Sequence, residues 1–105
     1  MSLGGKQRVF TKNVALLIIE AYKLGYELTF GDCYRDDRCD YGHKNSLHRS
    51  RLAVDLNLFK DGKYLDGIEA NEGHSELHNV WDSMGGAERI DNDLNHYSVE
   101  HQGMR

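Results

Sequence analysis

Residues 51–59, with the sequence RLAVDLNLF, constrain the fold of this chain more than any other segment. Apolar residues alternate along it, which is typical of a strand with one buried face. The predicted core face carries Leu52, Val54, Leu56 and Leu58, and the other face carries Ala53, Asp55, Asn57 and Phe59. The next four residues, KDGK, contain an Asp-Gly pair, which predicts a hairpin. The strand should therefore lie inside an antiparallel sheet.

The remaining elements follow from apolar spacing and from glycine positions. We expect a helix from Thr11 to about Leu24, a strand over residues 26–30, a helix over about 72–84 that ends at Gly85-Gly86, and a strand over about 95–101. Helices and hairpin strands in this order predict an α+β fold, with a small antiparallel sheet packed against two main helices. Residues 1–8 are expected to be flexible or added to the domain, and residues 31–47 to form a long functional loop.

Length and composition limit the class of protein. A chain of 105 residues fits one domain, residues 1–105. Its net charge of −4 does not favour binding to nucleic acid, and no apolar run is long enough for membrane insertion. The start MSLGGKQRVF lacks the apolar stretch of a signal peptide. Cys33 and Cys39 are expected to be reduced thiols rather than a disulfide, and without a CxxC pair they do not predict a metal site.

Asp55 lies in the middle of the predicted strand and needs a partner, because an unpaired buried carboxylate is strongly destabilising. His48 precedes it by seven positions, and a bend near Ser50 would bring the imidazole back to the carboxylate. The segment leading into the last strand supplies Asp93 and His96. Two imidazoles and one carboxylate suit Zn²⁺ with one coordination position open, as in a catalytic zinc site.

This spacing resembles that of the M15 family of zinc peptidases. The similarity rests on Ser46-x-His48-x6-Asp55 and on Asp93-x-x-His96-Tyr97. Further similar features are Tyr34-Arg35, the AVDL of residues 53–56, Trp81 ahead of Gly85-Gly86, and the NHYS of residues 95–98. The resemblance covers residues 26–98 and implies the fold of hedgehog and D,D-peptidase domains. One departure is Arg51, near the place where family members commonly have glycine.

The resemblance also implies roles for individual residues. One zinc ion per chain would be held by His48, Asp55 and His96. Asp93 would be the catalytic general base, in a position where many members have glutamate. Arg35 would face the substrate and stabilise the negative charge that develops on the attacked carbonyl, and Ser46 would form a hydrogen bond to the substrate.

The implied activity is hydrolysis of an amide bond in peptidoglycan stem peptides. The aspartate at position 93 favours an L-alanyl-D-glutamate endopeptidase of the phage endolysin type over a D,D-carboxypeptidase. A catalytically inactive, zinc-containing module of the cell wall or the virion remains an alternative. The enzyme would be a monomer, made in a host cytoplasm without a signal peptide and acting on the bacterial cell wall. Basic residues between Arg35 and Arg51 would suit the carboxylates of stem peptides.

Simpler interpretations stand beside these roles. His48 and Asp55 alone could be a salt bridge that fixes a loop to a strand, and Arg35 could be a surface residue. His74 and His78 lie four positions apart in the second predicted helix, where we expect a solvated face, although His74 could line the cleft. Trp81 is expected in the core.

Overall fold

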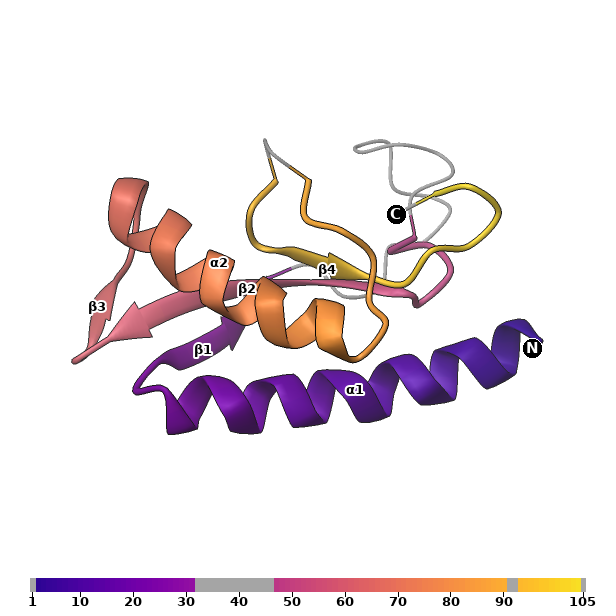
Figure 1. The fold of residues 1–105 in the computed structure, drawn as a ribbon, viewed down its shortest axis with the longest axis horizontal. Helices are drawn as coiled ribbons and strands as arrows, with labels where there is room; N and C mark the ends of the chain where they lie inside the picture. The colour runs from indigo at the N-terminus through magenta and orange to yellow at the C-terminus, as the bar shows by residue number, and fades with distance from the viewer. Residues whose placement is uncertain (1, 32–46, 91–92, 105) are drawn as a thin grey trace.

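The computed structural model describes residues 2–31, 47–90 and 93–104. It confirms the predicted α+β class, with two helices and a small antiparallel sheet (Figure 1). The elements are α1 (Leu3–Lys23), β1 (Glu27–Phe30), β2 (Ala53–Lys60), β3 (Lys63–Tyr64), α2 (Gly67–Ser83) and β4 (His96–Ser98). The alternating segment is thus the longest strand, and every other strand pairs with it.

The pairing register around β2 determines which residues meet. β1 runs antiparallel along one edge of β2, with Phe30 opposite Leu56. β4 and β3 both pair with the other edge, β4 near the start of β2 and β3 at its end. Between β4 and β3, two backbone hydrogen bonds continue along this edge of β2. The Leu58 carbonyl accepts from the Leu65 N–H (2.9 Å), and the Leu56 N–H donates to the Asn95 carbonyl (2.8 Å). Asn57 and Leu58 therefore lie in a gap between the two short strands.

The turn from β2 to β3 is the predicted hairpin. Asp61 and Gly62 both have positive φ, 52° and 77°, as a type I′ turn requires. The turn is built from the Asp-Gly pair that the sequence supplies, because these residues adopt this backbone conformation more readily than most.

The two faces of β2 differ as its alternation predicts. Leu52, Val54, Leu56 and Leu58 are buried in the core, whereas Asp55 and Asn57 are only partly buried. The helices contribute Phe10, Val14, Leu17 and Ala21 from α1, and Leu77 and Trp81 from α2. Phe10 meets Trp81 edge to face, with ring centroids 5.7 Å apart, so the helices are joined at the centre of the core.

The first helix begins earlier than the sequence pattern predicts. We expected Thr11 as its N-cap, but α1 begins at Leu3, and the Ser2 hydroxyl accepts a hydrogen bond from the Gly5 N–H (3.0 Å). Thr11 lies inside the helix and donates to the Gln7 carbonyl (2.9 Å). Contacts made by the first turns compensate for the weak helix propensity of Gly4 and Gly5, since the Gln7 amide donates to the Ser50 carbonyl (2.9 Å).

The second helix also begins earlier than expected, at Gly67 rather than near residue 72. The added turn lets α2 pass close to the sheet at Gly73, where a Cβ atom would lie 2.7 Å from Leu58. The end of α2 is as predicted, because Gly85 has φ 83°. Gly86 packs directly on the Trp81 indole, where a Cβ atom would clash.

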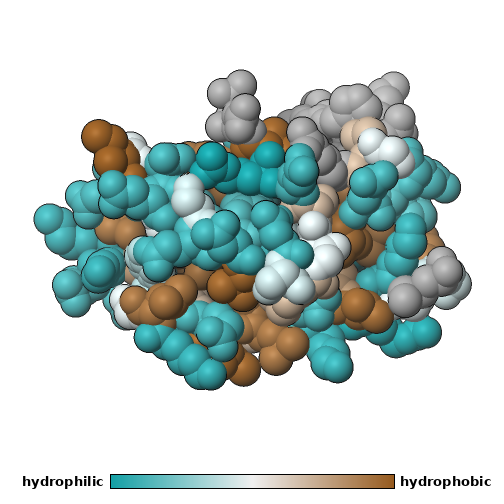
Figure 2. Space-filling view, in the orientation of Figure 1, coloured by the Kyte–Doolittle hydropathy of each residue, from teal (hydrophilic) through white to brown (hydrophobic). Residues whose placement is uncertain are grey.

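Polar side chains cover much of the face that α2 presents in Figure 2, and apolar ones gather toward the lower edge, where α1 runs. α1 carries exposed Val9, Leu16, Ile19 and Tyr22. Among the described residues, neither helix has the length and apolar character needed to cross a bilayer.

Candidate metal centre

A tight turn places His48 at the start of β2. Its neighbour Leu47 is buried, and the Leu47 carbonyl accepts hydrogen bonds from the N–H groups of Ser50 (3.2 Å) and Leu52 (2.9 Å). Arg51 closes this turn with φ 58°, in the left-handed region that favours glycine. The bend predicted near Ser50 is therefore present, and it turns the imidazole of His48 toward Asp55.

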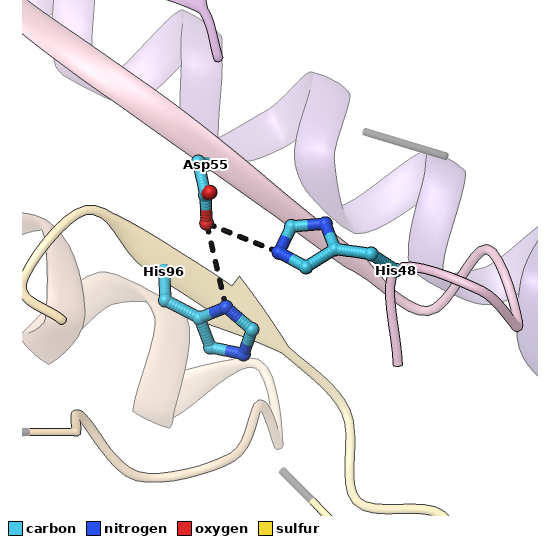
Figure 3. Close-up of side chains that lie close together, drawn as sticks. All are labelled: His48, Asp55 and His96. Carbon is cyan, nitrogen blue, oxygen red and sulfur yellow. Dashed lines mark ion pairs between the residues drawn. The ribbon is translucent and has the colours of Figure 1, made fainter. Parts of the chain in front are cut away.

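Strand pairing supplies the other two side chains. Asp55 of β2 and His96 of β4 are directly opposite each other in the antiparallel register, so they lie on the same face of the sheet. His48 Nε2 is 3.3 Å and His96 Nδ1 is 3.4 Å from Asp55 Oδ1 (Figure 3). The two imidazole rings meet at 73° with centroids 5.2 Å apart.

These three residues form a group that could hold a metal ion, with one ligand atom from each lying within 4.8 Å of the others. Two ligand atoms bound to zinc at about 2.0 to 2.1 Å in tetrahedral geometry are separated by about 3.3 to 3.4 Å. Both nitrogen–oxygen distances at Asp55 match that separation. The mixed nitrogen and oxygen set suits zinc, and it provides three of four tetrahedral ligands.

The polar atoms of this group are not satisfied by one another. Asp55 Oδ1 and both ring nitrogens of His96 are buried without a hydrogen-bond partner, although short distances separate them. Buried polar atoms in native proteins almost always have partners, and those that lack one require an explanation. A metal ion bound by these atoms would satisfy them.

Asp55 is ionised over the physiological pH range. Burial by itself raises the pKa of its carboxyl group, but the adjacent His48 and His96 together lower the pKa by more, to about 2. A carboxylate held ionised between two imidazoles is ready to bind a cation without first losing a proton.

Asp93 lies at the open side of this group. Its carboxylate Oδ2 is 3.6 Å from His96 Nδ1, and its side chain is 47% exposed. The hydrogen bond from the His96 N–H to the Asp93 carbonyl (3.1 Å) fixes the turn that precedes β4. The structure thus brings Asp93 beside His96, as the Asp-x-x-His spacing predicts, and leaves its side chain about half exposed.

Other predicted site residues lie outside the described part of the chain. Arg35 and Ser46 belong to residues 32–46, as do Cys33, Cys39 and most of the predicted functional loop. Their roles in substrate binding and catalysis stay predictions.

The expectation of a solvated face is wrong for both His74 and His78, which are buried, 4% exposed each. The alternative for His74 agrees with the structure, because His74 lines a groove beside Asp93. His74 Nδ1 is 2.7 Å from the Tyr97 hydroxyl, and His78 stacks on the Tyr97 ring with centroids 4.2 Å apart. The signal was present in the sequence, because the two histidines share the helical spacing of Leu77 and Trp81 and so belong to the same face of α2.

Burial determines the charge of both histidines. Burial first, and then His78 and Arg89, lower the pKa of His74 to about 4. Burial also lowers the pKa of His78, against the opposing influence of Asp82 and of the backbone at Leu94 and His96. Neutral imidazoles at positions 74 and 78 are therefore part of the folded core.

Trp81 is fully buried, as expected, and its indole N–H donates to the Ser98 carbonyl (2.7 Å). This bond ties α2 to β4 and so supports the strand that carries His96.

Models of known protein families do not match the chain, and a comparison with curated proteins also finds no match. The resemblance to M15 peptidases therefore rests on the residues and geometry described above.

Proposed function

We propose that this protein is a zinc-dependent peptidase of the M15 type that hydrolyses an amide bond in peptidoglycan stem peptides. The observation that carries the proposal is the pair of 3.3 and 3.4 Å distances from Asp55 Oδ1 to two histidine nitrogens, in a group with unpaired buried atoms. The same contacts are ion pairs of Asp55 when the two histidines are protonated, so the zinc content of the purified protein separates the metal site from a salt bridge. We further propose the L-alanyl-D-glutamate bond as the target, because position 93 is an aspartate.

In this proposal His48 Nε2, Asp55 Oδ1 and His96 Nδ1 hold the zinc ion. Bound zinc would act as a Lewis acid that polarises the carbonyl group and lowers the pKa of water to about 7. The remaining residues position the substrate and move the proton.

Asp93 is the proposed general base. Its half-exposed carboxylate would take a proton from the attacking water and later give it to the leaving amine. The 3.6 Å distance from Asp93 Oδ2 to His96 Nδ1 supports this role, because the carboxylate lies beside one of the proposed ligands. An aspartate is one methylene shorter than glutamate, so the turn that precedes β4 must hold it close.

Arg35 and Ser46 are proposed to bind the substrate on the side of residues 32–46. An arginine there would stabilise the oxyanion that forms on the attacked carbonyl. The nearby Arg38, Lys44 and Arg49 would attract the carboxylates of the stem peptide. The protein would act on the bacterial cell wall.

The test compares zinc content and wall cleavage in the wild type and in Asp93→Asn, which keeps the side-chain shape but cannot accept a proton as a base. Asp61→Asn is the matched control, because it makes the same chemical change in the β2–β3 turn and asparagine tolerates the positive φ there. Zinc is measured by atomic absorption on purified protein. Cleavage is measured as new amino termini released from purified walls, identified by mass spectrometry.

We expect about one zinc per chain in all three proteins, cleavage by the wild type and Asp61→Asn, and a loss of cleavage of at least about 100-fold in Asp93→Asn. A new terminus at D-glutamate would establish the L-alanyl-D-glutamate bond as the target, and one at D-alanine would indicate the carboxypeptidase alternative. Zinc without cleavage by the wild type would overturn the enzyme proposal and favour the inactive wall or virion module. A chain without zinc would overturn the metal site as well.

A further inference from the structure

A groove of about 450 Å³ extends from Asp93 along the gap in the sheet between β4 and β3. Its floor is formed by Asn57 and Leu58 of β2, and its walls by the start of α2 and by residues 93–95. Asp93 lines this groove and also lies 3.6 Å from His96, so the groove adjoins the candidate metal centre at Asp93.

His74 lines the groove from α2 and has one ring nitrogen left to face it. Nδ1 is paired with the Tyr97 hydroxyl at 2.7 Å. Nε2 has no hydrogen-bond partner among the described residues, yet it does not belong to the fully buried atoms without partners. Nε2 is thus the polar atom through which this otherwise buried ring reaches the groove.

The Tyr97 hydroxyl determines which nitrogen of His74 carries the proton. Tyr97 is fully buried, and within the described residues its hydroxyl has His74 Nδ1 as its hydrogen-bond partner. If the hydroxyl accepted a proton from Nδ1, its own O–H would be left unsatisfied in the core, which is costly. The hydroxyl therefore donates to Nδ1, and the neutral ring carries its proton on Nε2.

The charge of the groove limits what can accept a hydrogen bond there. Its described lining includes the carboxylates of Asp66 and Asp93 but no lysine or arginine. A carboxylate of the substrate would be repelled, whereas an uncharged amide carbonyl would not. The lining also offers an amide acceptor, because Asn95 Nδ2 donates to Asn57 Oδ1 (3.3 Å) and leaves Asn95 Oδ1 for an incoming N–H.

We propose that the groove binds an extended peptide segment of the substrate and that the His74 Nε2–H donates to one of its backbone carbonyl oxygens. His74 is thus a substrate-binding residue, and Tyr97 is a positioning residue that fixes its tautomer. The identity of the substrate as a stem peptide rests on the proposed function, but the groove and its donor do not. The carboxylates of the peptide would point away from the groove, toward solvent or the basic residues.

The experiment uses the zinc-loaded protein and a synthetic stem tetrapeptide, L-alanyl-γ-D-glutamyl-L-lysyl-D-alanine. His74→Leu removes the donor, and His74→Gln supplies an amide donor in its place. Imidazole ¹⁵N signals of the free protein report the tautomer of His74, which we expect to be protonated at Nε2. Tyr97→Phe should shift this ring toward a mixture of tautomers, a change that a purely structural hydroxyl would not cause.

If the wild type cleaves the peptide, His74→Leu should raise KM about tenfold, as expected for one lost hydrogen bond, with kcat within about threefold of wild type. His74→Gln should recover most of that loss. An unchanged KM in a folded, zinc-loaded His74→Leu protein would overturn the inference while leaving the proposed function intact. A proton on Nδ1 in the free wild type would also overturn it.

If the wild type does not cleave the peptide, the proposed function fails and the inference is tested by binding. Adding the intact peptide should then shift the His74 Nε2–H signal, and His74→Leu should bind about tenfold more weakly. An unshifted signal at saturating peptide would overturn the inference. Zinc content and melting temperature are measured for every variant, so that a folding defect is separated from lost binding.

Discussion

The described residues include two groups of buried histidines on opposite faces of β4, and the groups differ in whether a carboxylate lies between the rings. His96 faces Asp55 and His48, whereas the next residue, Tyr97, faces His74 and His78 on α2. In the first group, a carboxylate oxygen lies at 3.3 and 3.4 Å from two ring nitrogens and has no hydrogen bond. In the second group, the Tyr97 hydroxyl bonds to His74 and the Tyr97 ring stacks on His78, whose two ring nitrogens are also buried without a hydrogen-bond partner.

This difference separates the candidate metal centre from a group of polar residues in the core. Burial of a histidine is common to both groups, so burial alone does not identify a ligand. The distinguishing feature is a carboxylate with unpaired lone pairs between two imidazoles, because such an arrangement is stable only with a cation or with protons. The second group consists of Tyr97 and two histidines that burial keeps neutral, and among the described residues only the first group brings three metal-ligating side chains together.

The largest expected effect is on zinc affinity. Asp55→Asn should weaken zinc binding by more than about 100-fold, because it removes the only charged ligand of the three, and outer-sphere changes alone cost 10- to 100-fold. His78→Phe, which keeps the stack on Tyr97, should leave the affinity within about threefold of wild type. Competition with a chromophoric chelator measures both. Equal loss in the two variants would mean that the groups act as one site.

Removal of zinc should lower the melting temperature of the wild type by roughly 10 to 20 °C, because zinc at 100 times its dissociation constant stabilises a folded site by about 3 kcal/mol. Differential scanning calorimetry with and without chelator measures this shift. Asp55→Asn should show no shift with chelator, and His78→Phe should show the full one. If the melting temperature of the wild type did not change with chelator, the histidines of both groups would be purely structural.

As the pH is lowered, the stability that His74 contributes to the fold should be lost at a higher pH than the stability that Asp55 contributes. The folded-state pKa of His74 is depressed from 6.5 to about 4, so its contribution to stability is full above about pH 6.5 and is lost as the pH falls toward 4. His78 shifts in the same direction, with Arg89 and Asp82 as its charged neighbours. Asp55 contributes above about pH 4, and this contribution is lost only as the pH falls toward 2.

Urea unfolding of zinc-free protein measures this difference. Between pH 7 and pH 4.5 the wild type should lose more stability than His74→Gln, by roughly 2 to 3 kcal/mol. Parallel pH dependence in the two proteins would show that His74 is not held neutral by the core.

The smallest expected effect concerns the backbone, which is regular in α2 but strained in the turn that carries His48. Arg51 has φ 58°, so Arg51→Gly should raise the free energy of unfolding by about 1 kcal/mol relative to Arg51→Ala. The alanine variant loses the same side-chain contacts but keeps the strained φ, and is therefore the matched control. Chemical denaturation of both variants measures the difference, and equal stabilities would mean that the turn is not strained.

Several features of the fold could be predicted because they are local. The alternation in residues 51–59 gave the faces of β2, and the Asp-Gly pair gave the hairpin. Helix starts were predicted poorly, since contacts far along the chain stabilise them. The first turns of α1 depend on Ser50, and α2 approaches β2 where Gly73 meets Leu58, and neither contact is visible in a window of sequence.

The candidate site divides in the same way. The types and spacing of His48, Asp55, Asp93 and His96 were sufficient to select these residues, because a carboxylate in an apolar strand requires a partner. Only tertiary structure decided that Asp55 and His96 are opposite each other, since strand register depends on how β2 and β4 pair. The helical spacing of His74 and His78 already put them on the face of Leu77 and Trp81, and tertiary structure decided that Tyr97 is the residue they meet there.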